Sequence, residues 1–83
     1  MKNDESLLAF GLNVAKARKV KSYSQEKLAE IADLDRTYVS SVERGQRNVS
    51  LINILKIANA LSISPSELLE GIRYIDGQHN QSI

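Results

Sequence analysis

The stretch from Ser24 to Gly45, SQEKLAEIADLDRTYVSSVERG, constrains the fold of this chain most strongly. Ser24 can accept a backbone N–H of a first helical turn, and Glu26 is favourable near the positive end of a helix. Apolar residues then recur at the spacing that lines one helix face; they are Leu28, Ala29, Ile31 and Ala32. The pattern predicts a short helix that begins after Ser24 and ends before Asp33.

A second helix is predicted directly after it. Asp33-Leu34-Asp35 breaks the first run, and Asp35 is a second N-cap residue. Val39 and Val42 fall three apart on an inward face, and Gly45 can end the helix in a left-handed conformation. The side chains left largely outside are Arg36, Thr37, Tyr38, Ser40 and Ser41. Two helices joined by about three residues match the helix-turn-helix of DNA-reading proteins.

Helices are also predicted on both sides of this pair. Asn3 or Asp4 can cap a first helix that runs to about Lys21, and Gly11 leaves room for a neighbouring helix. The buried stripe expected of this helix is Leu7, Phe10, Val14 and Ala17. Ser50 can cap a fourth helix, in which the inward residues are expected to be Leu51, Ile54, Leu55, Ala58 and Leu61. Ile52 is then left on the outside.

The last predicted helix has the best-defined start in the chain. Ser64-Pro65-Ser66-Glu67 reads as a capping box with proline at the first helical position, and a fifth helix follows through Leu68, Leu69 and Ile72. No segment shows strand alternation, so the sequence predicts an all-α, five-helix domain over residues 1–75. Residues 76–83, DGQHNQSI, form a polar tail in which we expect weak order or disorder.

Composition limits the kinds of function that this chain can have. Its 83 residues support one small domain, it has no cysteine, and its single histidine, His79, lies in the polar tail. We therefore expect no metal site and no cofactor. Neither a nucleophile with its base nor a pair of buried carboxylates can be placed, so we expect no catalytic site and no small-molecule ligand. The N-terminus lacks a signal-peptide layout and no apolar run approaches the roughly 20 residues that span a bilayer, so a soluble cytoplasmic protein with no membrane partner is expected.

Charge is distributed unevenly along the chain. The formal net charge is only +1, yet residues 16–56 contain nine basic and five acidic residues, while the remainder has two basic and five acidic residues. Such asymmetry makes one end of a small domain attractive to phosphate. A solvated surface of mixed charge is the alternative on charge alone.

Several motifs together resemble a known family. Phe10-Gly11 with Val14 and Arg18 is followed by SQEKLA, DRTYVSSVERG, SLINILKIANAL and SPSELL. This layout, over about residues 7–70, resembles the helix-turn-helix family of phage repressors and xenobiotic-response-element regulators. The run LDRTYVSSVERGQRNVSL is most similar to the controller proteins of restriction-modification systems. The resemblance implies a lambda-repressor-like fold, encoded by a bacterium or a phage, in which the second and third helices read DNA and the last one or two helices form a symmetric dimer.

Three residues are predicted to read bases. Arg36 and Thr37 occupy the start of the third helix, the part that reaches base edges in the major groove. Arginine can pair with O6 and N7 of guanine, and the threonine methyl can pack on that of thymine. A structural pairing of Arg36 with Asp35 or a glutamate is the alternative. Arg47 resembles the family position that adds base contacts.

Contacts to the DNA backbone are predicted on both flanks of these residues; the residues are Gln25, Tyr38, Ser40, Ser41, Arg44 and Asn48. Gln25 resembles the phosphate clamp of the family. Alternatives remain for three of them, because Gln25 can be a solvated surface glutamine, Tyr38 can pack on the flank of the first helix and Asn48 can shape the turn before Ser50.

Other residues are expected to hold the domain or its dimer together. Arg18 and Glu43 match a family ion pair that is structural. The apolar residues predicted at a homodimer interface are Ile52, Ile63, Leu68, Leu69 and Ile72, although some of them can instead complete the core of a monomer.

The sequence thus predicts a homodimeric, sequence-specific transcriptional regulator that binds a pseudo-palindromic double-stranded DNA operator and controls restriction-modification genes. RNA polymerase is a further partner if acids such as Glu26, Glu30 or Asp33 contact it. An antitoxin-type module, whose main partner is a protein, is the alternative. A neighbouring toxin gene favours that alternative, whereas neighbouring methyltransferase and endonuclease genes favour the controller.

Overall fold

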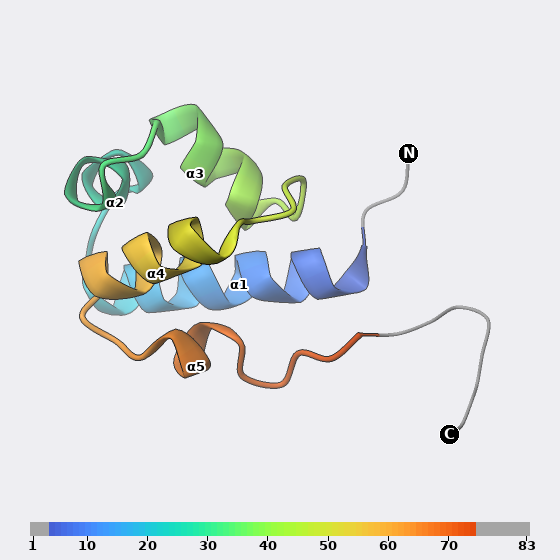
Figure 1. Ribbon diagram of the computed structural model, residues 1–83. Helices are drawn as coiled ribbons and strands as arrows, with labels where there is room; N and C mark the ends of the chain where they lie inside the picture. The colour runs from blue at the N-terminus through green and yellow to red at the C-terminus, as the bar shows by residue number, and fades with distance from the viewer. Residues whose placement is uncertain (1–3, 75–83) are drawn as a thin grey trace, which may run out of the picture.

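The computed structural model describes residues 4–74, which form five helices and no strand. The helices are α1 (Glu5–Val20), α2 (Gln25–Ala32), α3 (Arg36–Glu43), α4 (Leu51–Ala60) and α5 (Pro65–Leu68). Figure 1 shows α3 and α5 at opposite ends of the molecule, with α1 and α4 between them. The all-α, five-helix prediction is confirmed. The predicted polar tail, residues 76–83, lies outside the described residues, and none of the described helices is both long and apolar enough to cross a membrane.

Polar side chains cap the N-termini of all five helices, because the first backbone N–H groups of a helix have no partner within it. The cap residues are Asp4, Ser24, Asp35, Ser50 and Ser64. In the helix-turn-helix pair, Ser24 Oγ accepts from Lys27 N at 2.9 Å and Asp35 Oδ2 accepts from Thr37 N at 2.9 Å. Both caps were predicted. They fix where α2 and α3 begin.

The core joins all five helices. Its buried apolar residues are Phe10, Val14, Leu28, Ala29, Ala32, Val39, Val42, Ile57, Ala58, Ala60, Leu61 and Leu68. Contacts run from α1 to α3 and α5, from α2 to α3 and α4, and from α4 to α5. The α2–α3 pair is therefore seated on α1 and α4, which leaves the outer face of α3 uncovered (Figure 1).

Two glycines allow α3 to lie close to α1. A Cβ atom on Gly11 would fall 2.4 Å from the carbonyl oxygen of Val42 and 2.6 Å from that of Glu43, both backbone atoms of α3. Only glycine fits this crossing without moving a helix. Gly45 has φ of +75° just after α3, as predicted for a left-handed helix end.

The inward face of α4 differs from the prediction. Leu51 and Leu55 are 68% and 42% exposed, whereas Ile57, which was not predicted inside, is fully buried. The buried stripe continues from Ile57 through Leu61. The prediction failed because apolar residues occur on both sides of α4, so helical periodicity alone does not select the inner side. A smaller error of the same kind is Ile31 in α2, which is 42% exposed.

The fifth helix ends at Leu68 and is shorter than the sequence predicted, since the predicted helix continued through Leu69 and Ile72. Leu68 is fully buried in the core, so the prediction that it forms a dimer interface is wrong. Ile63 and Ile72 are partly buried against the same core, as the monomer alternative allowed. The other two predicted interface residues are open to solvent, with Ile52 62% exposed and Leu69 45% exposed.

Candidate nucleic-acid interface

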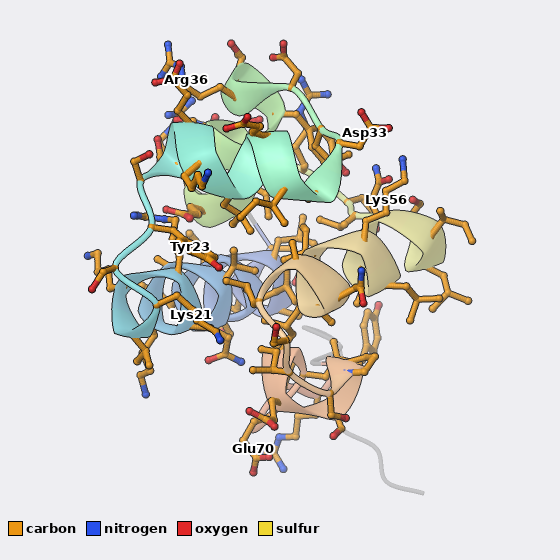
Figure 2. All side chains as sticks on the ribbon, turned by 90° about the vertical axis from the view of Figure 1, so that its left-hand side faces the viewer. Lys21, Tyr23, Asp33, Arg36, Lys56 and Glu70 are labelled. Atoms are coloured by element: carbon orange, nitrogen blue, oxygen red, sulfur yellow. The ribbon has the colours of Figure 1, made fainter. Side chains whose placement is uncertain are left out.

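The start of α3 presents its first side chains to solvent. Arg36 and Thr37 are both exposed, and the backbone enters α3 through Asp33, whose φ of +59° makes the turn tight. Figure 2 shows Arg36 pointing outward at the end of the molecule opposite Glu70. Of the two ion pairs in residues 4–74, neither involves Arg36. Its guanidinium is thus available to a ligand rather than committed to Asp35.

Beneath this surface lies an ion pair that connects α1 to the last turn of α3. Arg18 Nε donates to Glu43 Oε2 at 2.7 Å and Arg18 Nη2 donates to Glu43 Oε1 at 3.0 Å. The two side chains are only 12% and 6% exposed. The hydrogen bond with the Glu43 carboxylate raises the pKa of Arg18 above its already high usual value, although burial opposes this. The predicted structural pair is confirmed.

Gln25 joins this ion pair from the first position of α2. Its Nε2 donates to Glu43 Oε1 at 2.9 Å, and the side chain is half-buried. The side-chain amide that is predicted to bind a phosphate therefore already donates one hydrogen bond to Glu43. The phosphate contact stays a prediction.

Arg44 is held at the end of α3 by its neighbours. Its Nη1 donates to Ser40 Oγ at 2.5 Å, while its Nε and Nη2 donate to Gln46 Oε1 at 3.3 and 3.1 Å. Arg44 and Gln46 are exposed, and so is Asn48 in the following loop. These hydrogen bonds hold the positive charge of Arg44 at the C-terminal end of α3, whereas Arg36 lies at its N-terminal end.

Arg47 folds back from the loop onto α3. Its Nε donates to Ser41 Oγ at 3.2 Å, and its guanidinium carbon lies 5.6 Å from the centroid of the Tyr38 ring, a cation–π distance. Asn53 in α4 donates from Nδ2 to the Tyr38 hydroxyl at 3.0 Å. Tyr38 is thus joined to α4 and to Arg47, whereas the alternative drawn from the sequence placed it on the flank of α1. Asn53 was not predicted, because nothing in its local sequence indicates a partner 15 residues away.

Ser41 is misplaced in the sequence-based prediction of backbone contacts. It is only 6% exposed, and its hydroxyl donates to the carbonyl oxygens of Thr37 and Tyr38 within α3. A buried hydroxyl with these partners does not reach a phosphate, so the predicted DNA contact of Ser41 is wrong. Its role is to accept the hydrogen bond that holds Arg47. Ser40, one residue earlier, is half-buried and bound to Arg44 at the surface.

Three arginines therefore surround the open face of α3: Arg36 at its start, and Arg44 and Arg47 after its end. Two further exposed acids are Glu67 in α5 and Glu70, which Figure 2 shows at the other end of the molecule, whereas the exposed acids Glu26, Glu30 and Asp33 lie on and after α2. A face with three arginines attracts phosphate, while an arginine at a helix start can reach base edges in the major groove.

Comparison with known proteins identifies the family. A family model described as helix-turn-helix matches residues 14–68, which include all of α2, α3 and α4. The chain belongs to the helix-turn-helix family.

Within this family, the similar proteins include several that are named control or controller proteins. The chain is 56% identical to control protein C.BamHI of Bacillus amyloliquefaciens over 64 residues, which cover 76% of this chain and 79% of the relative. It is 52% identical to control protein C.MunI of Mycoplasma sp. over 66 residues, covering 78% of this chain and 89% of the relative.

A solved structure agrees with these relatives. The restriction-modification controller protein C.AhdI from Aeromonas hydrophila superposes with a TM-score of 0.74 at 58% identity, covering 75% of this chain and 94% of that one. The resemblance stated from the sequence is therefore confirmed: this helix-turn-helix chain is a DNA-binding transcription regulator of the restriction-modification controller type.

Proposed function

We propose that this chain is a homodimeric, sequence-specific transcriptional regulator that binds a pseudo-palindromic operator and controls restriction-modification genes. The observation that carries the proposal is the exposed pair Arg36 and Thr37 at the capped start of an uncovered α3. These side chains occupy the part of a recognition helix that meets base edges. Similarity to controller proteins supports the class of regulated genes.

In this proposal the base contacts come from both ends of α3. Arg36 pairs with O6 and N7 of a guanine, and Thr37 packs against a thymine methyl. Arg47 supplies a second base contact by extending from its place on Tyr38, where only its Nε is bound within residues 4–74.

Contacts to the phosphates lie around the base-reading residues and fix the orientation of the protein on the duplex. They come from Gln25, Tyr38, Ser40, Arg44 and Asn48, all of which are exposed or half-buried. Three exposed acids on and after α2, Glu26, Glu30 and Asp33, offer a surface for RNA polymerase beside the DNA.

An exposed apolar surface supports the homodimer. We define the α4 apolar face as Leu51, Ile52 and Leu55, which are 68%, 62% and 42% exposed and lie in the first five residues of α4. Contiguous exposed apolar groups on a small domain mark interfaces. In the proposed C2 dimer the two recognition helices enter the major groove about 34 Å apart, one turn of DNA, so the site is a pseudo-palindrome.

Dimerisation can be tested by placing a charge on this face. We expect Ile52→Glu to make the chain monomeric at micromolar concentrations, because the substitution buries a carboxylate in the interface. Operator binding should weaken at the same time. Sedimentation equilibrium and DNA-binding titrations measure the two effects. The matched control is Leu12→Glu on α1, since Leu12 is 67% exposed but lies off the α4 apolar face. Equal association of the two variants and the wild type would place the dimer contact elsewhere.

Sequence-specific binding can be tested by selection from a random double-stranded DNA library. The expected product is a pseudo-palindrome whose half-sites are one helical turn apart, as footprinting of the selected site will show. A matching site is expected next to the gene for this chain and beside endonuclease or methyltransferase genes. The proposal fails if no sequence is enriched, because a basic surface alone binds all DNA in a salt-dependent way.

A further inference from the structure

We propose that Glu43 is a positioning residue for phosphate binding, because it fixes the orientation of the Gln25 side-chain amide. This inference rests on the proposed phosphate contact of Gln25 and deepens it. Glu43 itself is 6% exposed in its side chain and sits below the surface at the end of α3, so it does not touch DNA.

The carboxylate of Glu43 accepts hydrogen bonds from two residues. Its Oε2 accepts from Arg18 Nε at 2.7 Å, and its Oε1 accepts both from Arg18 Nη2 at 3.0 Å and from Gln25 Nε2 at 2.9 Å. The bidentate contact with Arg18 holds the carboxylate in one place. Glu43 is therefore a rigid acceptor for Gln25 rather than a mobile one.

The same arginine also fixes the backbone before α2. Arg18 Nη1 donates to the carbonyl oxygen of Tyr23 at 2.8 Å, and Tyr23 precedes the cap residue Ser24. The start of α2 and the side chain of its first residue, Gln25, are thus held by one cluster. Backbone N–H groups in the first turn of a helix are the usual phosphate donors, so the cluster sets their direction as well.

An ionised carboxylate only accepts hydrogen bonds, which decides how the amide of Gln25 must face. Its NH₂ group has to point to Glu43, because its oxygen would be repelled there. One N–H is used by Glu43 and the second remains for a phosphate oxygen. A glutamine without this partner can also turn its acceptor oxygen towards the phosphate, where it donates no hydrogen bond. Preorganisation of this kind strengthens binding without adding a contact.

A double-mutant cycle on DNA binding tests the inference. The proteins are the wild type, Gln25→Ala, Glu43→Gln and the double variant, each titrated with a random-sequence duplex and with the selected operator. We expect Gln25→Ala and Glu43→Gln to weaken binding to both duplexes by about 3- to 10-fold. In the Gln25→Ala background, Glu43→Gln should weaken binding less than about 2-fold.

The outcomes separate the two claims. A loss from Glu43→Gln that is the same with and without Gln25 shows a merely structural role and overturns the inference alone. An unchanged affinity of Gln25→Ala refutes the proposed phosphate contact, and the positioning role with it.

A second measurement uses the wild-type protein and does not depend on how the variants fold. Side-chain amide hydrogen exchange by NMR compares Gln25 with Gln46, whose Oε1 accepts from Arg44 but whose Nε2 donates to no group within residues 4–74. One amide proton of Gln25 should exchange several-fold more slowly than those of Gln46. Equal exchange rates would overturn the fixed orientation.

Discussion

Replacing Arg18 with leucine is expected to lower the free energy of unfolding by about 3–5 kcal/mol, because it leaves the Glu43 carboxylate buried without its counter-charge. Glu43 is 6% exposed, so solvent does not compensate for the lost partner. Urea unfolding followed by circular dichroism measures the change. The double variant Arg18→Leu with Glu43→Leu should regain much of the loss, because apolar residues of similar size replace buried ion pairs with little net effect.

A surface ion pair in the same chain provides the matched control. Lys27 Nζ lies 3.8 Å from Glu30 Oε1, and the two side chains are 52% and 74% exposed. Lys27→Ala should change the stability by less than about 0.5 kcal/mol. A loss from Arg18→Leu as small as that from Lys27→Ala would contradict the structural role of the buried pair.

The stabilisation by Arg18 should not depend on pH in the ordinary range. The Glu43 carboxylate raises the pKa of Arg18, so the contribution of Arg18 to stability is complete below the already high unfolded-state pKa of arginine and disappears only as pH rises through the still higher folded-state pKa. The difference in stability between the wild type and Arg18→Leu is thus expected to be constant from pH 6 to pH 10. A difference that shrinks steadily across this range would show that another group carries the effect.

Replacing Arg36 with alanine is expected to weaken binding to the selected operator by about 1–3 kcal/mol for each half-site, because a bidentate contact to guanine is lost in each of them. Binding to a random duplex should change far less. Fluorescence anisotropy at one fixed salt concentration measures both affinities, since salt alone alters them strongly.

Arg73 provides the control for Arg36, because it is an exposed arginine close after α5, at the other end of the molecule. Arg73→Ala should leave the affinities for operator and random DNA unchanged within about 2-fold, as removal of a distant charge predicts. An equal loss on both duplexes from Arg36→Ala would assign Arg36 to the phosphate backbone instead of a base.

The sequence predicted those features of the fold that depend on local interactions. Ser24 and Asp35 cap helices by accepting from backbone N–H groups two or three residues away, so a few neighbouring residues in the sequence are enough to predict their role. The roles of Gly11 and Gly45 were also predicted correctly. Gly11 leaves room for the neighbouring helix, and Gly45 adopts the left-handed conformation that ends α3. The inward face of α4 could not be predicted, because α4 has apolar residues on two sides and either side could pack against the rest of the domain.

The candidate site was predicted less completely than the fold. Successive helical residues point about 100° apart, so Ser40 and Ser41 share a sequence context but only Ser40 reaches the surface. The contacts of Gln25 with Glu43 and of Tyr38 with Asn53 join residues 18 and 15 positions apart. Contacts at such separations follow from the packing of helices, and a single sequence shows no pattern for them.

The most direct test of base reading by α3 removes the guanine atom that Arg36 is proposed to contact. Guanines of the selected operator are replaced one at a time by 7-deazaguanine, which lacks N7, and each duplex is titrated with the wild type and with Arg36→Ala. We predict that one position in each half-site weakens the wild type while leaving Arg36→Ala unaffected, because the variant has no guanidinium to lose there. If every replacement weakens the two proteins equally, the start of α3 does not read guanine through Arg36.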